Sequence, residues 1–234
     1  MSALMQFDEA NSTSMVYREI KQRIVNLRYG IGERLSEARL AEELGVGRSP
    51  IRTALWRLKL EGWIAISPQS GTYIKAMTLR EIREVADLRI VLEMRVAADA
   101  ASRMSDEMLA TLRSDFQLHG SRIASGDADA FIAIDNQLHS AIYDAADNQL
   151  ICQILLDLRD KVQWIRRVCS VSMERVQDGF AELERVLSAL ERRDEAGAAQ
   201  AMHDHVKSAA AFCAHLEETG SGLFAPHRKQ ANTA

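Results

Sequence analysis

A carboxylate and an imidazole lie four residues apart in the run Asp135-Asn136-Gln137-Leu138-His139. If this run is helical, both side chains project from the same face, because residues four apart are neighbours on a helix. Carboxylate oxygens and imidazole nitrogens can together ligate a divalent metal ion of the Zn or Ni type. The same two groups can equally hydrogen-bond to each other, so the spacing leaves a metal site and a structural pair open.

A second group of residues suited to chemistry is basic and lies nearer the N-terminus. Arg48, Ser49 and Arg52 follow the segment Gly45-Val46-Gly47 and open a stretch of helical spacing that ends at Gly62. Two helices joined by a short glycine-containing turn form a helix-turn-helix. The second helix of such a unit presents its first residues to base edges and phosphates, so these three residues are candidate DNA contacts.

The residues after Gly62 predict a β-hairpin. Two short apolar runs, Trp63 to Ile66 and Thr72 to Lys75, bracket the polar segment Ser67-Pro68-Gln69-Ser70-Gly71, which has the composition of a turn. Helix, glycine turn, basic helix and hairpin in this order favour a winged helix-turn-helix that binds double-stranded DNA. The alternative is a small helix-hairpin unit that contacts other proteins.

The elements that carry these residues divide the chain into two domains. We expect a flexible tail at residues 1–13, the winged helix-turn-helix at residues 14–77, and a second flexible tail at residues 219–234. Residues 78–218 show helical spacing in about six segments, and short loops place successive helices side by side. The expected fold class is therefore mainly α, with an antiparallel all-α bundle after the head. The expected helix N-caps in the bundle are Asp127, Asp147 and Asp194.

Charge is distributed unevenly between the two parts. Residues 1–77 carry 11 Lys and Arg against 8 Asp and Glu, whereas the remainder carries 18 against 25. A basic domain joined to an acidic one is compatible with nucleic-acid binding at one end. No apolar run approaches the roughly 20 residues of a membrane helix, and the three cysteines lack CxxC spacing. We therefore expect a cytoplasmic protein with reduced thiols and no membrane partner.

Three runs of the head form a specific combination: Gly32-Glu33-Arg34-Leu35-Ser36-Glu37, Leu40-Ala41-Glu42-Glu43-Leu44-Gly45-Val46 and Arg48-Ser49-Pro50-Ile51-Arg52-Thr53-Ala54-Leu55. With Gly71-Thr72-Tyr73-Ile74 they resemble the GntR-type bacterial transcriptional regulators. The resemblance implies that Arg48 and Arg52 contact DNA, as does the hairpin tip at Ser70-Gly71. Gly47 departs from the Ser or Thr that is usual there, which removes a hydroxyl contact without threatening the fold.

The bundle resembles the FCD ligand-sensing domain of the FadR branch of that family. The matching residues are Leu88-Arg89-Ile90-Val91-Leu92-Glu93, the run from Asp135 to His139, Asn148-Gln149-Leu150 and the stretch from Asp194 to His205. About six helices would place the domain in the VanR-like subset of that branch, because the FadR-like subset has seven.

Metal-binding FCD domains hold their ion with one Asp and three His. The resemblance maps these positions onto Asp135, His139, Leu183 and His205, so Leu183 stands where a histidine is expected. Three ligands can still hold a metal whose open position is filled by water or effector. Alternatively, the metal site has been abandoned, His205 is a hydrogen-bonded interior residue, and a small molecule binds directly.

Arg89 and Asn148 are the candidate effector-binding residues. The resemblance implies that a first-helix arginine helps to bind an organic acid, and a guanidinium suits a carboxylate. The alternative for Arg89 is an i,i+4 ion pair with Glu93, and the alternative for Asn148 is a helix N-cap.

Together these features predict a homodimeric, ligand-responsive transcription regulator that is not an enzyme. Each protomer would place its recognition helix in a major groove, and a twofold dimer predicts a palindromic operator. The main alternative is a helical-bundle metalloenzyme with an accessory DNA-binding head, in which Asp135, His139 and His205 hold a hydrolytic metal. A pure scaffold, a third interpretation, predicts no salt-dependent DNA affinity.

Overall fold

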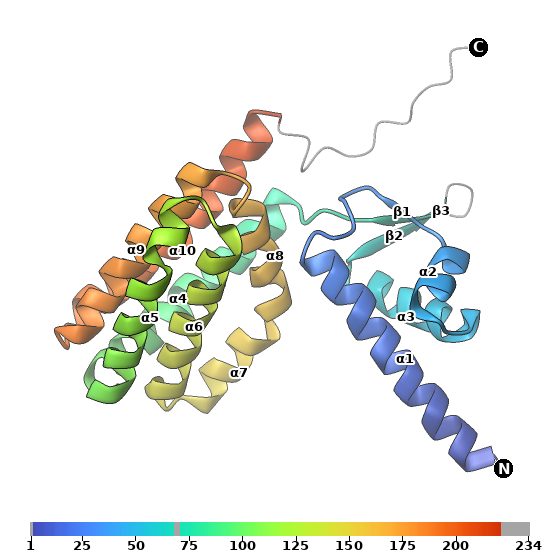
Figure 1. The fold of residues 1–234 in the computed structure, drawn as a ribbon, viewed down its shortest axis with the longest axis horizontal. Coiled ribbons are helices and arrows are strands. Elements are labelled where there is room, and N and C mark those ends of the chain that lie inside the picture. Colours follow the sequence, from blue (N-terminus) through green and yellow to red (C-terminus); the bar gives the residue numbers. More distant parts are fainter. Residues whose placement is uncertain (1, 68–70, 221–234) are drawn as a thin grey trace. The chain divides into compact units, whose positions relative to one another are not determined.

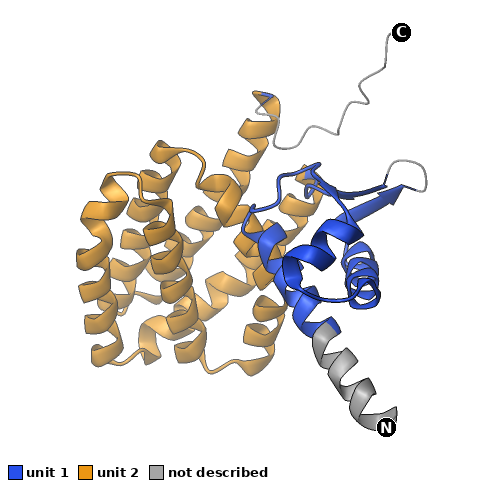
Figure 2. Ribbon diagram, turned by 45° about the vertical axis from the view of Figure 1, so that its right-hand side comes forward, with its two compact units in different colours: residues 1–78, 220–234 blue, residues 79–219 orange. Residues whose placement is uncertain are grey.

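The computed structural model describes residues 2–67 and 71–220. For residues 2–12 it describes only the helical backbone. The chain forms two compact units, residues 1–78 with 220–234 and residues 79–219 (Figure 2). The predicted tail at residues 219–234 lies outside the described residues from 221 onward. Within the described residues, no helix is long and apolar enough to cross a membrane.

The first unit contains three helices and three short strands in its described part (Figure 1). In chain order they are α1 (Ser2–Val25), β1 (Arg34–Leu35), α2 (Glu37–Leu44), α3 (Arg48–Leu60), β2 (Ile64–Ser67) and β3 (Gly71–Ile74). Apolar residues at helical spacing on α1, α2 and α3 pack together and exclude water. The largest fully buried side chains of this core are Ile20, Ile24, Leu40, Ile51 and Leu58.

The first helix begins earlier than the sequence predicted. Its backbone is helical from Ser2, within the segment expected to be a tail. Residues 2–13 contain neither glycine nor proline, so nothing in their composition interrupts a helix that the buried residues of the following turns stabilise.

The turn between α2 and α3 follows the local chemistry of its residues. Ser36 caps α2 by accepting a hydrogen bond from the Arg39 amide, and α2 ends at Gly45, whose φ of 64° is left-handed. A glycine has no Cβ to clash in that conformation. Helix α3 then starts after Gly47, with Pro50 in its first turn, where proline's missing N–H is not needed.

The predicted hairpin is present and gains a third strand. Strands β2 and β3 pair antiparallel with Ile64 opposite Ile74, and β1 pairs with β3 on the other side, giving the order β1-β3-β2. The sequence did not predict β1, because two residues are too few for an alternating pattern. The hairpin tip at residues 68–70, which includes the predicted DNA contact Ser70, lies outside the described residues.

The second unit is entirely helical over its described residues 79–219. Its helices are α4 (Leu79–Arg103), α5 (Asp106–Ala124), α6 (Ala128–Ala146), α7 (Gln149–Asp157), α8 (Arg159–Cys169), α9 (Met173–Glu191) and α10 (Glu195–Glu218). Helix α4 packs along α10 and α6 (Figure 1). Small residues on α4, including Ala97 and Ala100, are fully buried in the apolar cluster and allow the neighbouring helices to approach closely.

Seven helices in residues 79–219 correct the predicted six. The missed break is Leu158, which ends α7 and precedes α8 with near-helical angles, φ −82° and ψ −9°. No glycine, proline or polar cap marks this break, so the sequence predicted one helical segment where the structure has α7 and α8. The assignment to the VanR-like subset rested on six helices and loses its basis.

Side-chain caps begin most helices of the bundle. Asp127 and Asp194 cap α6 and α10 as predicted, because their carboxylates accept hydrogen bonds from the backbone amides of Ala130 and Gly197. The prediction for Asp147 was wrong, since this residue ends α6 with a left-handed φ of 55°. Its neighbour Asn148 caps α7 instead, accepting a 3.2 Å hydrogen bond from the Ile151 amide.

The cap at Asp194 gives a test of this architecture. We expect Asp194→Ala to lower the free energy of unfolding of the bundle by about 1 kcal/mol, because an amide of the first turn of α10 loses its acceptor. Asp194→Asn is the matched control and should retain most of the stability, since Asn caps as well as Asp. Calorimetric unfolding of the full chain measures both, and equal melting temperatures for wild type and Asp194→Ala would contradict the assignment.

Candidate functional site: an exposed basic helix and a buried ionic network

The predicted DNA contacts on α3 lie together on its exposed face. Ile51 and Leu58 are fully buried in the head, so the helix must turn its remaining faces to solvent. Arg48, Ser49 and Arg52 are all exposed, in the first turns of the helix. The structure therefore brings three of the five predicted DNA contacts onto one accessible surface.

A carboxylate that the sequence did not single out holds Arg52. The Arg52 Nη2 atom lies 3.2 Å from Glu37 Oε2, and its Nε atom lies 3.4 Å from Glu37 Oε1. Glu37 stands in the first turn of α2. Because the Arg52 side chain remains 72% exposed, this pair orients the guanidinium without removing it from solvent.

Gly71, the fourth predicted contact, begins β3 beside Arg34. Its φ is 107°, and a Cβ atom placed on it would lie 2.8 Å from the Arg34 Nε atom. The positive φ favours glycine at this position, because a residue with a Cβ rarely adopts it, whereas the flexible Arg34 side chain could move aside. The glycine that the resemblance assigned to DNA contact has a structural role as well.

The predicted metal ligands meet inside the bundle. His205 Nε2 on α10 lies 3.1 Å from Asp135 Oδ1 on α6, and His139 Nε2 lies 3.7 Å from the same oxygen. One ligand atom from each of the three residues lies within 4.8 Å of the others. All three residues are buried, with at most 4% of their surface exposed.

Two glutamates orient the two histidines. Glu93 Oε2 on α4 lies 3.1 Å from His139 Nδ1, and Glu182 Oε2 on α9 lies 3.0 Å from His205 Nδ1. A carboxylate at Nδ1 favours a proton there and leaves Nε2 with its lone pair. Both Nε2 atoms face Asp135, so the arrangement has the carboxylate–histidine order typical of metal sites.

Three arginines balance the three buried carboxylates around these histidines. Arg89 makes two hydrogen bonds to Glu93, at 2.7 and 3.2 Å, and Arg175 makes two to Glu182, at 3.1 and 2.9 Å. Arg166 on α8 contacts Asp135 Oδ2, the oxygen that faces away from the histidine contacts. Such pairing is required because an unpaired charge in the protein interior is strongly unfavourable.

The surroundings shift the pKa values of the two histidines in opposite directions. Burial lowers the pKa of His139, and the carboxylates of Glu93 and Asp135 offset only part of that effect. Burial acts on His205 in the same direction, but its contacts with Asp135 and Glu182 prevail and raise the pKa of His205. His139 is therefore the neutral imidazole of the pair at neutral pH, whereas His205 retains a proton more readily.

The pKa of the central carboxylate responds to the same neighbours. Burial alone would raise the pKa of Asp135, yet the charge of Arg166 and the contacts with both histidines outweigh it and hold that pKa well below its usual range. Asp135 is accordingly an anion at any physiological pH, the form in which a carboxylate binds a cation.

Unsatisfied atoms indicate that the residues present fit a metal ion. Of the proposed donor atoms, Asp135 Oδ1 and His139 Nε2 lack an aligned hydrogen bond within the described part of the chain. Buried polar atoms are usually satisfied, so a cation at Asp135 Oδ1 and the two Nε2 atoms would supply what the protein does not. Leu183, the fourth mapped position, is fully buried in the apolar cluster, so this donor set has three members.

The two predicted effector residues lie in different environments. Arg89 is buried, with both donor atoms of its fork on Glu93, and thus forms the i,i+4 pair that was its alternative interpretation. It reaches the histidines only through Glu93, which also accepts a 3.0 Å hydrogen bond from Tyr143. Asn148 is the N-cap of α7, its own alternative interpretation.

The sequence did not identify Arg166, Arg175 or Glu182 as part of this network. Arg175 and Glu182 are seven residues apart on α9, a helical spacing that could have suggested a pair. Arg166 meets Asp135 across 31 positions of sequence, and no local pattern signals such a contact. Of the glutamates in this network, the sequence suggested only Glu93, as an i,i+4 partner of Arg89.

Comparisons with known proteins place both halves of the chain. Residues 12–74 match the model of the bacterial regulatory proteins of the gntR family, and residues 84–208 match the FCD domain. The HTH-type transcriptional repressor RspR of Escherichia coli is 28% identical over 214 residues, which are 89% of this chain and 92% of that protein. The gluconate operon transcriptional repressor of Bacillus licheniformis is 30% identical over 170 residues, 72% of this chain and 68% of that protein.

A solved structure agrees with the fold. The structure of E. coli McbR/YncC superposes with a TM-score of 0.71 at 20% identity, covering 88% of this chain and 98% of that one. These relatives are transcriptional regulators and not enzymes, which decides against the metalloenzyme alternative. With its winged helix-turn-helix head and a ligand-binding helical domain, the chain belongs to the GntR family of DNA-binding transcriptional regulators with an FCD domain.

Proposed function

We propose that this regulator is a homodimer whose DNA binding responds to a divalent metal ion and a small organic acid in the FCD domain. One observation carries the sensor assignment: the Nε2 atoms of His139 and His205 converge on Asp135 Oδ1, while a glutamate occupies each Nδ1. Each imidazole is held at Nδ1 by one glutamate and directs its Nε2 atom at the shared carboxylate of Asp135. This is the arrangement of histidines that ligate a metal ion.

The proposed DNA contacts follow from the exposed face of α3. Arg48, Ser49 and Arg52 would reach base edges and phosphates in the major groove, with the hairpin tip at Ser70 and Gly71 on the neighbouring backbone. Glu37 holds Arg52 in an exposed position, and a phosphate or a base edge can replace that carboxylate. Two heads related by a twofold axis would read a palindromic operator.

The metal would be held by Asp135, His139 and His205. Nitrogen and oxygen donors of this kind suit Zn or Ni. When bound, the ion supplies a Lewis acid with coordination positions open to an oxygen ligand. Arg166 would keep the second oxygen of Asp135 engaged, and Glu93 and Glu182 would keep both imidazoles in the required tautomer.

An organic acid fits the charges around this centre. A carboxylate can take a coordination position that Leu183 cannot fill, and Arg166 is the guanidinium that contacts the central ligand. One relative is named for a gluconate operon, and gluconate is itself a hydroxycarboxylic acid. Because Arg89 is committed to Glu93, we assign it an indirect part in effector binding, the positioning of His139, and we assign Asn148 the role of a cap.

Exposed apolar residues on α4 support the homodimer. Leu88 and Val91 are 41% and 68% exposed, and residues three apart share one face of a helix. An apolar face on the longest helix of the bundle is suited to an isologous contact with a second copy.

The DNA contact gives the first prediction. Arg52→Ala should weaken operator binding by about ten- to a hundredfold, because one charged contact to DNA is lost while α3 keeps its buried face. The control Arg80→Ala removes the same charge from α4, where the side chain is 88% exposed. Gel-shift titration on fragments selected by the wild-type protein measures both. Near-normal affinity of Arg52→Ala would rule out the assigned contact.

The metal site gives the second prediction. His205→Ala should abolish stoichiometric Zn binding in calorimetry, whereas His215→Ala, an exposed histidine of the same helix, should leave it intact. Since contacts with Asp135 and Glu182 raise the pKa of His205, a proton competes with Zn, and affinity should fall as the pH drops through that raised pKa. Equal Zn binding by the two variants would remove the metal from the proposal.

The proposed dimer contact gives the third prediction of this function. We expect Val91→Glu to convert a dimer into a monomer in sedimentation velocity, because a charge on the apolar α4 face opposes its burial. Leu118→Glu places the same charge on α5, where Leu118 is 70% exposed, and should remain dimeric. A dimeric Val91→Glu protein would exclude this face as the interface.

A further inference from the structure

Two cysteines from different helices face each other in the bundle. Cys169 Sγ at the end of α8 lies 3.7 Å from Cys213 Sγ on α10, and the two residues are 44 positions apart in sequence. The thiol of Cys169 also lies 3.5 Å from the Ala209 carbonyl oxygen. Both cysteines are buried, and no metal-ligand pattern of the sequence included them.

The sulfur atoms are close enough to be joined by a small movement. A disulfide has an S–S distance of about 2.05 Å, so the two sulfurs must approach by roughly 1.6 Å. Rotation about the side chains with a slight shift of one helix end can supply that distance. Cys169 is the last residue of α8, and a short connection from Ser170 to Ser172 follows it before α9.

The positions of the two cysteines connect them to the sensor. Cys169 lies one turn beyond Arg166, which contacts Asp135, and Cys213 lies two turns beyond His205, which contacts the same carboxylate. A covalent bond between α8 and α10 would therefore restrain the two helices that carry partners of Asp135.

We propose that Cys169 and Cys213 are a reversible oxidation site whose disulfide changes the operator affinity of the regulator. The inference does not depend on the proposed metal or effector, because it rests on the two sulfur atoms and the helices that hold them.

The chemistry requires a two-electron oxidant of the hydroperoxide class. The Cys169 thiolate attacks one peroxide oxygen, the O–O bond breaks, and hydroxide leaves to give a sulfenic acid. Cys213 sulfur then attacks the Cys169 sulfur and the S–O bond breaks, while the Cys213 proton leaves with the hydroxide as water. The two thiols supply both electrons, and a small thiol reductant reverses the reaction by exchange.

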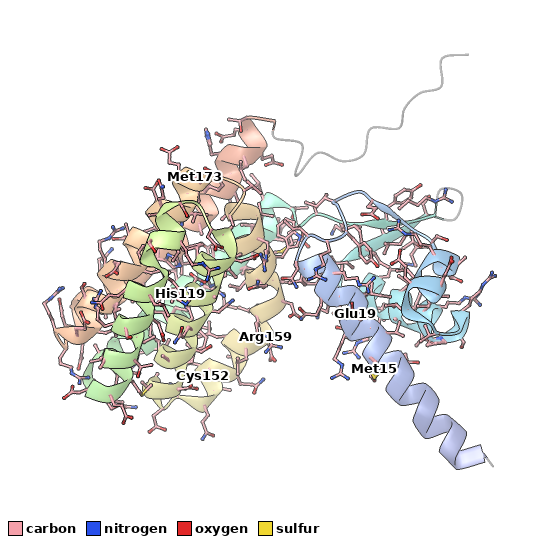
Figure 3. The ribbon with its side chains drawn as sticks, viewed as in Figure 1. Met15, Glu19, His119, Cys152, Arg159 and Met173 are labelled. Carbon is pink, nitrogen blue, oxygen red and sulfur yellow. The ribbon has the colours of Figure 1, made fainter. Side chains whose placement is uncertain are left out.

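The surroundings favour Cys169 as the attacking group. The contact with Cys213 and the positive charge of Arg175 lower the pKa of Cys169 in spite of burial, whereas the contact with Cys169 and burial raise the pKa of Cys213. Cys152 on α7, labelled in Figure 3, has its thiol pKa raised by burial, and it serves as an internal comparison.

The test uses the full-length protein and needs no variant for its first part. Reduced protein is treated with hydrogen peroxide, free thiols are blocked, and peptides are mapped by mass spectrometry without reduction. We expect a cross-link between the Cys169 and Cys213 peptides with the loss of two hydrogens, reversed by dithiothreitol. Two blocked, unlinked thiols at these positions after Cys152 has oxidised would overturn the proposal.

The second part measures the consequence for DNA. In Cys152→Ala protein, oxidation should change operator affinity at least about fivefold and dithiothreitol should restore it. Cys152→Ala/Cys213→Ala protein, shown by calorimetric unfolding to be folded, should keep its affinity under the same treatment. A disulfide that forms without changing the affinity of the first protein would reject the regulatory role, as would an equal response of both proteins.

Discussion

The burial of one carboxylate constrains most of the FCD domain. Asp135 is 1% exposed, and an ion in that position is tolerated only where opposite charges and donors surround it. Arg166, His139 and His205 meet this requirement from α8, α6 and α10. Each imidazole in turn needs an acceptor, which Glu93 and Glu182 provide, and each glutamate needs a cation, which Arg89 and Arg175 provide. One buried charge thus commits five helices to a single arrangement.

This dependence explains how a small ligand could influence so large a domain. A cation or an oxyanion at Asp135 adds a charge to a network whose three carboxylates and three guanidiniums already balance. Ionic groups in a low-dielectric interior interact strongly, so the contacts on α4, α8, α9 and α10 must readjust together. Coupling of this kind needs two arrangements that ligand and operator each favour differently.

Local sequence signals predicted the elements of the head, whereas the ionic network of the bundle depends on contacts between residues distant in sequence. Gly45, Gly62 and the apolar spacing of α3 act within a few residues, so the helix-turn-helix and hairpin were readable. The strand β1 was too short to recognise, and Leu158 breaks a helix without a breaker residue. In the bundle, the i,i+4 spacing suggested Asp135 and His139, and the resemblance added His205. Arg166 and Glu182 become their partners only after helices distant in sequence pack together. The same limit applied to Cys169 and Cys213.

The two domains use charge in opposite ways. On the head, Arg52 and Glu37 remain in water, where an ion pair is weak and screened by salt. In the proposed DNA contact, a phosphate would therefore replace the glutamate with little loss. In the bundle, the same kinds of side chain are removed from water. Removing one member of a pair there leaves the other as an unpaired charge in the protein interior, which is strongly unfavourable. Exchangeable charge suits a surface that must bind and leave many sites on DNA. Committed charge suits a domain that must distinguish one ligand from others, because an incorrect ligand leaves a buried ion unpaired.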